Sequence, residues 1–308
     1  MISKRLLLVV ALVIAGGLGA CGKGDVKPGA SGEPTETEVV ETTTTTAAAE
    51  EPAAAASITL TGTEYAYAYP DGEGPAPIPA GPVTVTLENE GVEEHQISIV
   101  KLKPGKTQDD FLGLATDISQ FDDVLETWGG PNGVAPGDSN TTTQVLEAGD
   151  YFFACFIPSA DEIPHIVNGM LLPVTVEGEL PEPVEGANDP ITMSDYSFGL
   201  SKDAAEPTEL SGSNEWRFVN DGPQPHEAAI YAPAEGSTMQ DIVDYLASPA
   251  PEGPPPFVGA GGIGPIDVGR DVIAGLDPGE YVFMCFIPDA ADGLPHFLKG
   301  MIEFATVT

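Results

Sequence analysis

Basic residues are scarce in this 308-residue chain: 11 lysines and arginines stand against 48 acidic residues, a formal net charge of -37. Such an excess of negative charge repels phosphate backbones, so it argues against nucleic acid as a partner and favours a well-solvated surface. The sequence also contains a glycine-rich run that could be taken for a phosphate-binding loop, but it does not fit that motif. Residues 259–265 lack the lysine of a P-loop, and we expect them to form a flexible turn.

The apolar run near the N-terminus, residues 6–20, is too short to span a bilayer comfortably. It follows Lys4 and Arg5 and ends in small residues before Cys21, which is typical of an export signal. The last residues of the run resemble a bacterial lipoprotein cleavage box, which implies that Cys21 is lipidated. We therefore expect residues 1–21 to be a lipoprotein signal peptide, and the protein to be exported and anchored to the outer face of the cell membrane. The alternative is an ordinary secretory signal with an incidental cysteine.

Cysteine is scarce as well, since only Cys155 and Cys285 accompany Cys21. An exported chain favours disulfides, so a bridge between Cys155 and Cys285 is one interpretation. Both residues, however, occupy matched positions in two repeats, on strands expected inside separate domains. A bridge would need their Cα atoms within about 7 Å of each other, which argues against it.

Two segments have the composition of linkers. Residues 22–57 are rich in Thr, Ala, Glu, Pro and Gly and contain no aromatic residue, so we expect a disordered tether. Residues 179–189 are rich in Pro and Glu and indicate an interdomain linker. The remaining segments, 58–178 and 190–308, are each long enough for one hydrophobic core.

These two segments repeat one pattern. The matched runs are NEGVEEH (89–95) with NDGPQPH (220–226), GDYFFACFIP (149–158) with GEYVFMCFIP (279–288), and PHIVNGM (164–170) with PHFLKGM (295–301). A repeat of about 130 residues is too long for a solenoid unit and indicates tandem domains.

Short β-rich runs, separated by Gly, Pro and Asn, dominate each half. In the first half they are 57–60, 83–87, 96–100, 151–156 and 171–176. This pattern predicts a β-sandwich. Residues 107–127 and 238–247 have helical spacing instead, so each half should carry a short helical insertion between its first histidine and its cysteine.

All four histidines belong to the repeat, and each copy adds a cysteine and a methionine. The first copy runs His95, Cys155, His165, Met170, and the second runs His226, Cys285, His296, Met301. The spacings nearly agree: 60 and 59 residues from His to Cys, 10 and 11 from Cys to His, and 5 from His to Met in both. Alternate residues of a strand share one face, so each of these ligands lies on the same inward side as a row of apolar residues. Tyr151, Phe153 and Cys155 form one such row. Two imidazoles, a thiolate and a thioether are the soft ligand set of a blue-copper centre, and thioether is a poor ligand for zinc, calcium or magnesium.

These motifs resemble those of the cupredoxins, most closely the plastocyanin and halocyanin type. The resemblance rests on the Pro-His-x3-Gly-Met run of both halves and on the tyrosine-bearing strand that ends in Cys. It implies an all-β fold of two tandem Greek-key β-sandwich domains, one type 1 copper in each, and one-electron transfer. It also implies that the histidines and the cysteine of each copy are equatorial ligands, with Met170 and Met301 axial. The loops between Cys and the second His, 156–164 and 286–295, are much longer than in plastocyanin.

The leading hypothesis is thus an exported, membrane-tethered electron carrier that exchanges electrons with redox partner proteins. We expect no enzymatic activity, because copper oxidases and nitrite reductases need further copper held by additional histidines, often one directly before the Cys. Ala154 and Met284 stand at that position here. Two alternatives stay open. A copper-handling lipoprotein would use the same ligands, and a metal-free interaction module would have ligands that do not converge.

Apolar residues surround the second histidine of each copy. They are Ile163, Pro164, Ile166 and Val167 around His165, and Leu294, Pro295, Phe297 and Leu298 around His296. On so acidic a chain, this apolar collar is typical of a docking patch for a transient redox partner. Alternatively, the same side chains fold inward beneath the long loop between Cys and His.

Overall fold

The computed structural model describes residues 56–72, 74, 77–114, 120–181, 190–200, 208–211, 214–248 and 252–308. The expected signal peptide with Cys21, nearly all of the expected tether and most of the expected linker lie outside these residues. The first strand, β1 (Ala56–Thr63), begins two residues before the expected start of the first domain. Within the described ranges, no helix has the length and apolar character needed to cross a membrane.

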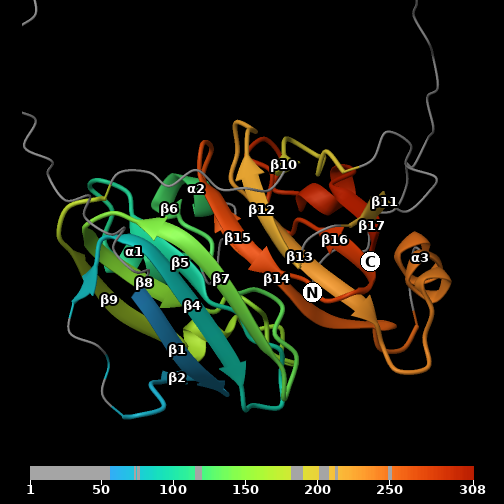
Figure 1. Cartoon of the computed structure of the whole chain (residues 1–308), viewed down its shortest axis with the longest axis horizontal. Coiled ribbons are helices and arrows are strands. Elements are labelled where there is room, and N and C mark those ends of the chain that lie inside the picture. Colours follow the sequence, from blue (N-terminus) through green and yellow to red (C-terminus); the bar gives the residue numbers. More distant parts are fainter. Residues whose placement is uncertain are drawn as a thin grey trace, which may run out of the picture. The chain divides into compact units, whose positions relative to one another are not determined.

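The first half is a β-sandwich (Figure 1). One sheet has the order β7-β4-β1-β2 and the other β3-β9-β8-β5-β6. Its strands after β1 are β2 (Ala66–Ala68), β3 (Ile78–Pro79), β4 (Gly81–Asn89), β5 (Ser98–Leu102), β6 (Leu125–Thr127), β7 (Ser139–Leu146), β8 (Gly149–Ala154) and β9 (Leu171–Glu177). Alternate residues of these strands, such as Leu60, Leu87, Ile99 and Phe153, are fully buried in one cluster between the sheets. The expected pattern of strands is therefore confirmed.

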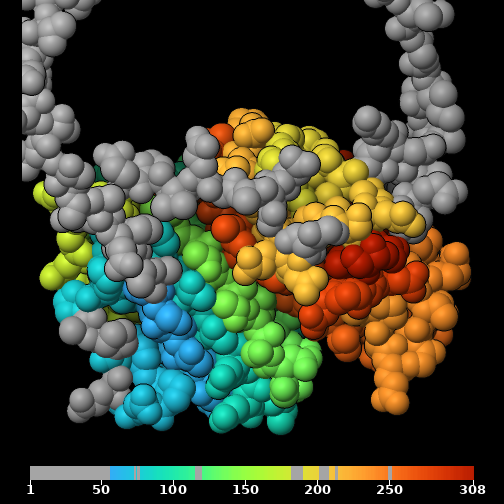
Figure 2. All heavy atoms as spheres, in the orientation of Figure 1, coloured from blue at the N-terminus to red at the C-terminus, as the bar shows by residue number. Residues whose placement is uncertain are grey.

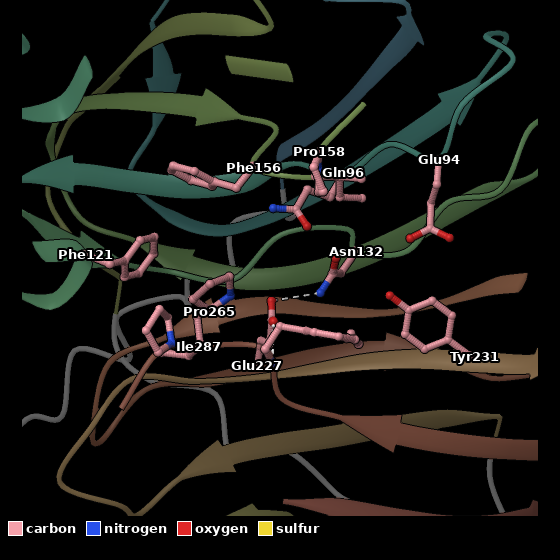
Figure 3. Close-up of a pocket in the computed structure, with 14 residues that line it drawn as sticks. Glu94, Gln96, Phe121, Asn132, Phe156, Pro158, Glu227, Tyr231, Pro265 and Ile287 are labelled. Carbon is pink, nitrogen blue, oxygen red and sulfur yellow. Dashed lines mark hydrogen bonds between the residues drawn. The ribbon is translucent and has the colours of Figure 1, made fainter. Parts of the chain in front are cut away.

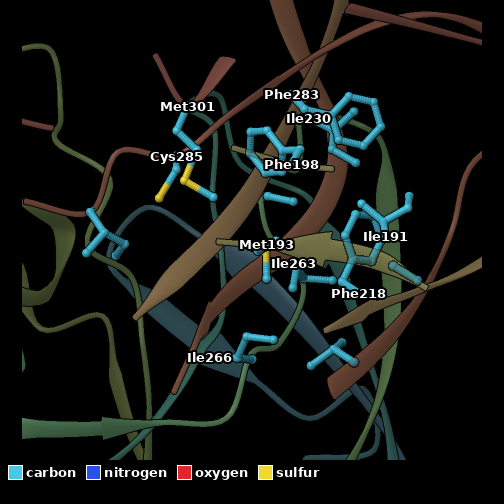
Figure 4. Packing of buried hydrophobic residues seen from close by; sticks show 14 of the residues in the cluster. Ile191, Met193, Phe198, Phe218, Ile230, Ile263, Ile266, Phe283, Cys285 and Met301 are labelled. Carbon is cyan, nitrogen blue, oxygen red and sulfur yellow. The ribbon is translucent and has the colours of Figure 1, made fainter. Parts of the chain in front are cut away.

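The second half repeats this arrangement. Its sheets are β10-β12-β15 and β11-β17-β16-β13-β14. The strands are β10 (Ile191–Met193), β11 (Thr208–Leu210), β12 (Glu215–Asn220), β13 (His226–Pro233), β14 (Phe257–Ile266), β15 (Asp271–Gly275), β16 (Gly279–Met284) and β17 (Ile302–Val307). Figure 4 shows its buried side chains, including Phe218, Ile230 and Phe283, packed together with Cys285 and Met301. The predicted fold class, all-β with two β-sandwiches, is confirmed.

Short helices interrupt the strands where helical spacing predicts them. They are α1 (Gln108–Gly113) and α2 (Phe121–Val124) in the first half and α3 (Met239–Ala247) in the second. Both α1 and α3 begin with a capping box, in which Thr107 pairs with Asp110 and Thr238 with Asp241. The predicted helical segment 107–127 extends too far, because its last residues form β6.

The two halves share a sheet. Strand β7 of the first half pairs antiparallel with β15 of the second, with Gln144 opposite Val272 and Thr143 opposite Ile273. The result is one seven-stranded sheet that spans both halves. Green atoms of the first half and orange atoms of the second meet in Figure 2. Residues Pro52–Thr308 accordingly form a single compact unit.

The glycine-rich run 259–265 is not the flexible turn that the sequence suggests. It lies in β14, which pairs with β13 and also contacts the first half through the bridges Val134–Ala260 and Pro131–Ile263. Glycine is required by close backbone contact: a Cβ on Gly262 would lie 2.0 Å from the carbonyl oxygen of Ala228, at a φ of 102°. The run is therefore a buried seam between the halves.

Candidate metal centres

An asparagine and a glycine shape the loop before the first histidine of each half. Asn89 donates from Nδ2 to the carbonyl oxygens of Glu93 and Val134, and its Oδ1 accepts from the backbone of Gly91. A side chain on Gly91 would lie 2.8 Å from Nε2 of His95. Asn220 and Gly222 repeat this arrangement before His226. The NxG motif thus brings the first histidine into the core.

The Pro-His-x3-Gly-Met run turns back on the cysteine. After Pro164 the chain forms a short 3-10 helix, His165–Asn168, which ends at Gly169 with a left-handed φ of 110°. That turn lets the carbonyl oxygen of Met170 accept a hydrogen bond from the backbone of Cys155 at 3.2 Å. The second half repeats the helix, His296–Lys299, and the bond from Cys285 to Met301. The motif therefore brings the last three ligand candidates of each half together.

Donor atoms of the first half converge inside the protein. Nδ1 of His95 lies 3.1 Å from Nδ1 of His165, and Sγ of Cys155 lies 3.4 Å from the latter nitrogen. All three side chains are fully buried. Met170 is also buried, and its side chain lies near the ring of His95 beside Gly62. A Cβ atom built on Gly62 would lie 3.5 Å from Cε of Met170 and 3.6 Å from the ring of His95.

The second half has the same arrangement. The Nδ1 atoms of His226 and His296 are 3.1 Å apart, and Sγ of Cys285 lies 4.0 and 3.5 Å from them. Cys285 and Met301 lie side by side, with a backbone hydrogen bond between them (Figure 4). In each half, the imidazole and thiol donor atoms all lie within 4.8 Å of one another. Both cysteines are free thiols, so the alternative of a disulfide between them is wrong.

A carboxylate fixes the tautomer of one histidine in each half. Nε2 of His165 lies 3.1 Å from Oε2 of Glu93, and Nε2 of His226 lies 3.1 Å from Oδ1 of Asp195. Because a carboxylate accepts hydrogen bonds, each Nε2 donates and each Nδ1 keeps a free lone pair aimed at the other donors. That tautomer is the one required to bind a metal through Nδ1, and carboxylate–histidine pairs of this kind commonly orient metal ligands.

The other two histidines face acids at longer range. Nε2 of His95 lies 3.6 Å from Glu64, and Nε2 of His296 lies 3.9 Å from Asp289. Neither nitrogen has a hydrogen bond within the described residues. All four histidines thus turn Nδ1 inward and Nε2 toward an acid.

The thiols need a cation to ionise. Burial raises the pKa of Cys155 to about 12 and also raises the pKa of Cys285. A protein without metal therefore holds thiols, whereas a bound soft cation would favour the thiolate. Buried thiol, inward Nδ1 lone pairs and an adjacent methionine fit copper better than zinc or calcium.

A tyrosine with unusual backbone geometry supports the second histidine of each half. Tyr65 and Tyr196 both have a φ of 66°, the left-handed region that non-glycine residues rarely adopt. The ring of Tyr65 meets His165 edge to face at 5.2 Å, and that of Tyr196 meets His296 at 5.5 Å. The positive φ costs about 1 to 3 kcal/mol of backbone strain at each tyrosine. Because both halves retain it, it indicates a functional constraint.

The two centres are linked through the seam between the halves. The backbone of His95 exchanges two hydrogen bonds with Val134, and nearby Asn132 donates to Oε2 of Glu227 at 3.1 Å. Glu227 follows His226, and its Oε1 accepts at 3.0 Å from the backbone of Phe286, next to Cys285. Figure 3 shows Asn132 and Glu227 facing each other across this seam. Hydrogen bonds and short stretches of backbone therefore connect ligand candidates of both centres.

Next to this link lies a cavity of about 300 Å³. Residues that directly follow the cysteines and first histidines line it, among them Phe156, Phe286, Gln96 and Glu227. Burial raises the pKa of Glu227 to about 7. Because both halves build its wall, the cavity is a property of the joined molecule.

The apolar collars divide between surface and core. Ile163, Val167 and Leu298 are 42%, 48% and 59% exposed, whereas Ile166 is buried. Phe297 is half-buried, with its ring 5.0 Å from that of Phe286. Each of the two sequence interpretations thus applies to part of the collar.

All eight ligand candidates are brought together as two groups of four, while Cys21 lies outside the described residues. The sequence interpretation missed the acids Glu64, Glu93, Asp195 and Asp289 and the tyrosines Tyr65 and Tyr196. A signal for some of them exists, since Glu64-Tyr65 and Asp195-Tyr196 occupy equivalent positions in the repeat.

No protein-family model and no curated protein sequence matches the chain. Solved structures similar to it include a dithionite-reduced auracyanin from the photosynthetic bacterium Roseiflexus castenholzii, with 23% identity over 40% of this chain and 98% of that one, at a TM-score of 0.28. A copper-containing nitrite reductase from Thermus scotoductus has 14% identity over 83% and 62%, at a TM-score of 0.25. A blue copper oxidase from Nitrosomonas europaea has 16% identity over 82% and 85%, at a TM-score of 0.22.

These similarities correct one prediction. The number of histidines led to the expectation that this chain is not an enzyme. The similar structures include a nitrite reductase and a copper oxidase, which are enzymes, and they contradict that expectation. Counting histidines in one chain cannot exclude enzymatic activity, because another chain of an assembly can supply ligands.

Proposed function

We propose that this protein carries single electrons, with one type 1 copper centre in each half. The observation that carries the proposal is the convergence of two imidazole nitrogens and one thiol within 4.8 Å, repeated in both halves beside a buried methionine. Copper held there would supply a one-electron couple. The proposed ligands are His95, Cys155, His165 and Met170 in the first half, and His226, Cys285, His296 and Met301 in the second.

Burial of the ligands supports electron transfer over copper delivery. All eight proposed ligand side chains have an exposed fraction of 0%. A delivery protein must pass its metal to another ligand set, which needs access to the donors, whereas an electron crosses a thin protein layer. The hydrogen-bonded link between Asn132 and Glu227 further supports exchange of electrons between the centres.

We propose that redox partners dock on the exposed part of the collars. Val167 and Leu298, next but one to the second histidines, are the most exposed collar residues of their halves. An apolar spot beside a buried ligand, on an otherwise acidic surface, suits a transient partner.

We also propose that the protein is exported and held at the outer face of the membrane by lipid on Cys21. The support is the sequence: an apolar run of export-signal length that stops at a cysteine. Cys21→Ser should then release the protein from the membrane fraction, and unchanged retention would contradict lipid anchoring.

Copper titration of residues 22–308 tests the function. We expect intense thiolate-to-copper colour that saturates at one equivalent per half, and reversible one-electron reduction. Cys155→Ser and Cys285→Ser should each remove about half of the colour, because each removes one thiolate. Met193→Leu, which changes a buried methionine outside the proposed ligand sets, is the matched control and should keep the full colour. A loaded protein that stays colourless would reject type 1 copper.

A further inference from the structure

The charged groups around the two centres differ at several equivalent positions of the repeat, among them Ser159, which corresponds to Asp289, and Gln96, which corresponds to Glu227. Glu93 of the first half corresponds to Gln224 of the second, and Asn168 corresponds to Lys299. Glu93 contacts the second histidine of its half, and Asn168 and Lys299 each follow that histidine by three residues. Both halves have the same candidate ligands, so one molecule holds the same kind of centre with two different sets of charged neighbours.

In the first half, the second histidine contacts an acid, Glu93, that forms no ion pair with a lysine or arginine among the described residues. Oε2 of Glu93 lies 3.1 Å from Nε2 of His165, and Oε1 accepts from the backbone of Ala160 at 3.2 Å. Glu64 lies 3.6 Å from His95 and accepts from backbone groups. Among the described residues, the ionised groups that shift the pKa of His165 are these two acids.

In the second half, a cation compensates the acid that faces the second histidine. Asp289 lies 3.9 Å from Nε2 of His296 but only 2.8 Å from Nζ of Lys299. It also accepts hydrogen bonds from the amide of Gln224 and the hydroxyl of Tyr196. Its charge is thus turned toward donors other than the histidine.

Glu64 and Asp195 occupy equivalent positions, and each faces Nε2 of the first histidine of its half, at 3.6 Å for Glu64 and 3.1 Å for Asp195. Each half therefore has one carboxylate beside its first histidine. Besides burial, two acids raise the pKa of each cysteine, one in the seam and one beside a histidine: Glu94 and Glu93 for Cys155, and Glu227 and Asp195 for Cys285. The remaining acid near His296 is Asp292, which is 45% exposed and binds Lys299 at 3.0 Å, so solvent screens it.

The sign of the effect follows from Coulomb's law. An oxidised centre carries one more positive charge than a reduced one, so a nearby carboxylate stabilises the oxidised form and a nearby ammonium destabilises it. Groups that contact metal ligands through their second nitrogen act strongly, because the ligand transmits the charge.

We propose that Glu93 and Lys299 make the two centres unequal, so that the centre in the second half has the higher reduction potential. This inference rests on the proposed function. An electron that enters the first centre then has a favourable transfer to the second: the first centre is oxidised by one electron and the second is reduced by one. The link through Asn132 and Glu227 joins the two.

Redox titration of the copper-loaded protein, followed by visible absorption, tests the proposal. Cys285→Ser isolates the first centre, and Cys155→Ser isolates the second. The second centre should hold its electron at least tenfold more tightly, equivalent to about 59 mV for one electron. Glu93→Gln should raise the reduction potential of the first centre by a similar amount, and Lys299→Asn should lower the reduction potential of the second.

Exchanging the residues in the opposite direction supplies an independent measurement. Gln224→Glu should lower the potential of the second centre, and Asn168→Lys should raise that of the first. Asp161→Asn and Lys106→Asn remove exposed charges that contact neither centre. They should change how tightly either centre holds its electron by less than about twofold.

The outcomes separate the two hypotheses. Two blue centres with equal potentials, or a Glu93→Gln shift in the opposite direction, overturn the inference and leave the proposed function intact. A loaded protein without blue colour overturns the proposed function, and the inference with it.

Discussion

At the scale of single residues, burial dominates the chemistry of the ligand histidines. It is the first cause that lowers the pKa of His95, His165, His226 and His296, that of His226 to about 4. The folded chain therefore binds these protons less tightly than the unfolded chain, whose histidines titrate near 6.5. Neutral histidines with lone pairs available are the form a metal needs.

The metal-free protein should accordingly lose stability in acid. Above pH 6.5 both states hold neutral histidines, so these groups leave the free energy of unfolding unchanged. Between pH 6.5 and about 4 the unfolded state takes up protons first, and His226 alone should cost on the order of 3 kcal/mol. Urea unfolding at pH 7.5, 6 and 5 measures the slope. His226→Asn should flatten it, and an equal slope in that variant would contradict the assignment.

Phe297 shows how burial separates two roles within one collar. Its side chain packs against the cluster of Ile242, Val282 and Met284, whereas neighbouring Leu298 is 59% exposed. Phe297→Asp should therefore destabilise the protein by about 2 kcal/mol or more. Leu298→Asp should leave the melting temperature nearly unchanged and slow transfer to a redox partner. A Phe297→Asp protein with normal thermal stability would show that this ring belongs to the surface.

At the scale of elements, strand β14 depends on glycine. Gly262 has a φ of 102°, and a Cβ there would lie 2.0 Å from the backbone oxygen of Ala228 and 2.9 Å from Ile230. A backbone oxygen in a paired strand cannot move away cheaply, so Gly262→Ala should cost more than about 3 kcal/mol.

The matched control is Gly236→Ala. This glycine also has a positive φ, 82°, but open space surrounds its Cβ position. Its substitution should cost only the left-handed strain, about 1 to 2 kcal/mol. Chemical unfolding of both variants separates contact from strain, and equal losses would reject the close approach at Gly262.

At the scale of the whole molecule, the halves should unfold together. The pairing of β7 with β15 and the bond from Asn132 to Glu227 hold them in one unit. Calorimetry of the metal-free protein should show one transition with equal van't Hoff and calorimetric enthalpies. Asn132→Ala leaves the buried Glu227 with one donor fewer and should shift this transition down as a whole, by about 1 to 3 kcal/mol. Two resolved transitions would mean that the halves are independent.

Much of each centre could be predicted from the sequence, because its parts are local. Pro164 to Met170 form one turn, and strand alternation determines which way Tyr151, Phe153 and Cys155 point. The acids escaped prediction because Glu93 and His165 are 72 residues apart and meet only after folding. The glycine run of β14 was misread because its partner, the first half, is distant in the chain.

The sequence by itself determined which eight side chains gather as two groups of candidate metal ligands and which segments become strands. Repeated spacing and a two-residue alternation carry that information, since both act over short distances. Only the tertiary structure decided that the two sandwiches share a sheet and that acids orient the histidines. It also decided that Lys299 pairs with Asp289, whereas no lysine or arginine of the described segments pairs with Glu93. Edge pairing and charge contacts depend on approach in space, which leaves no periodic trace along the chain.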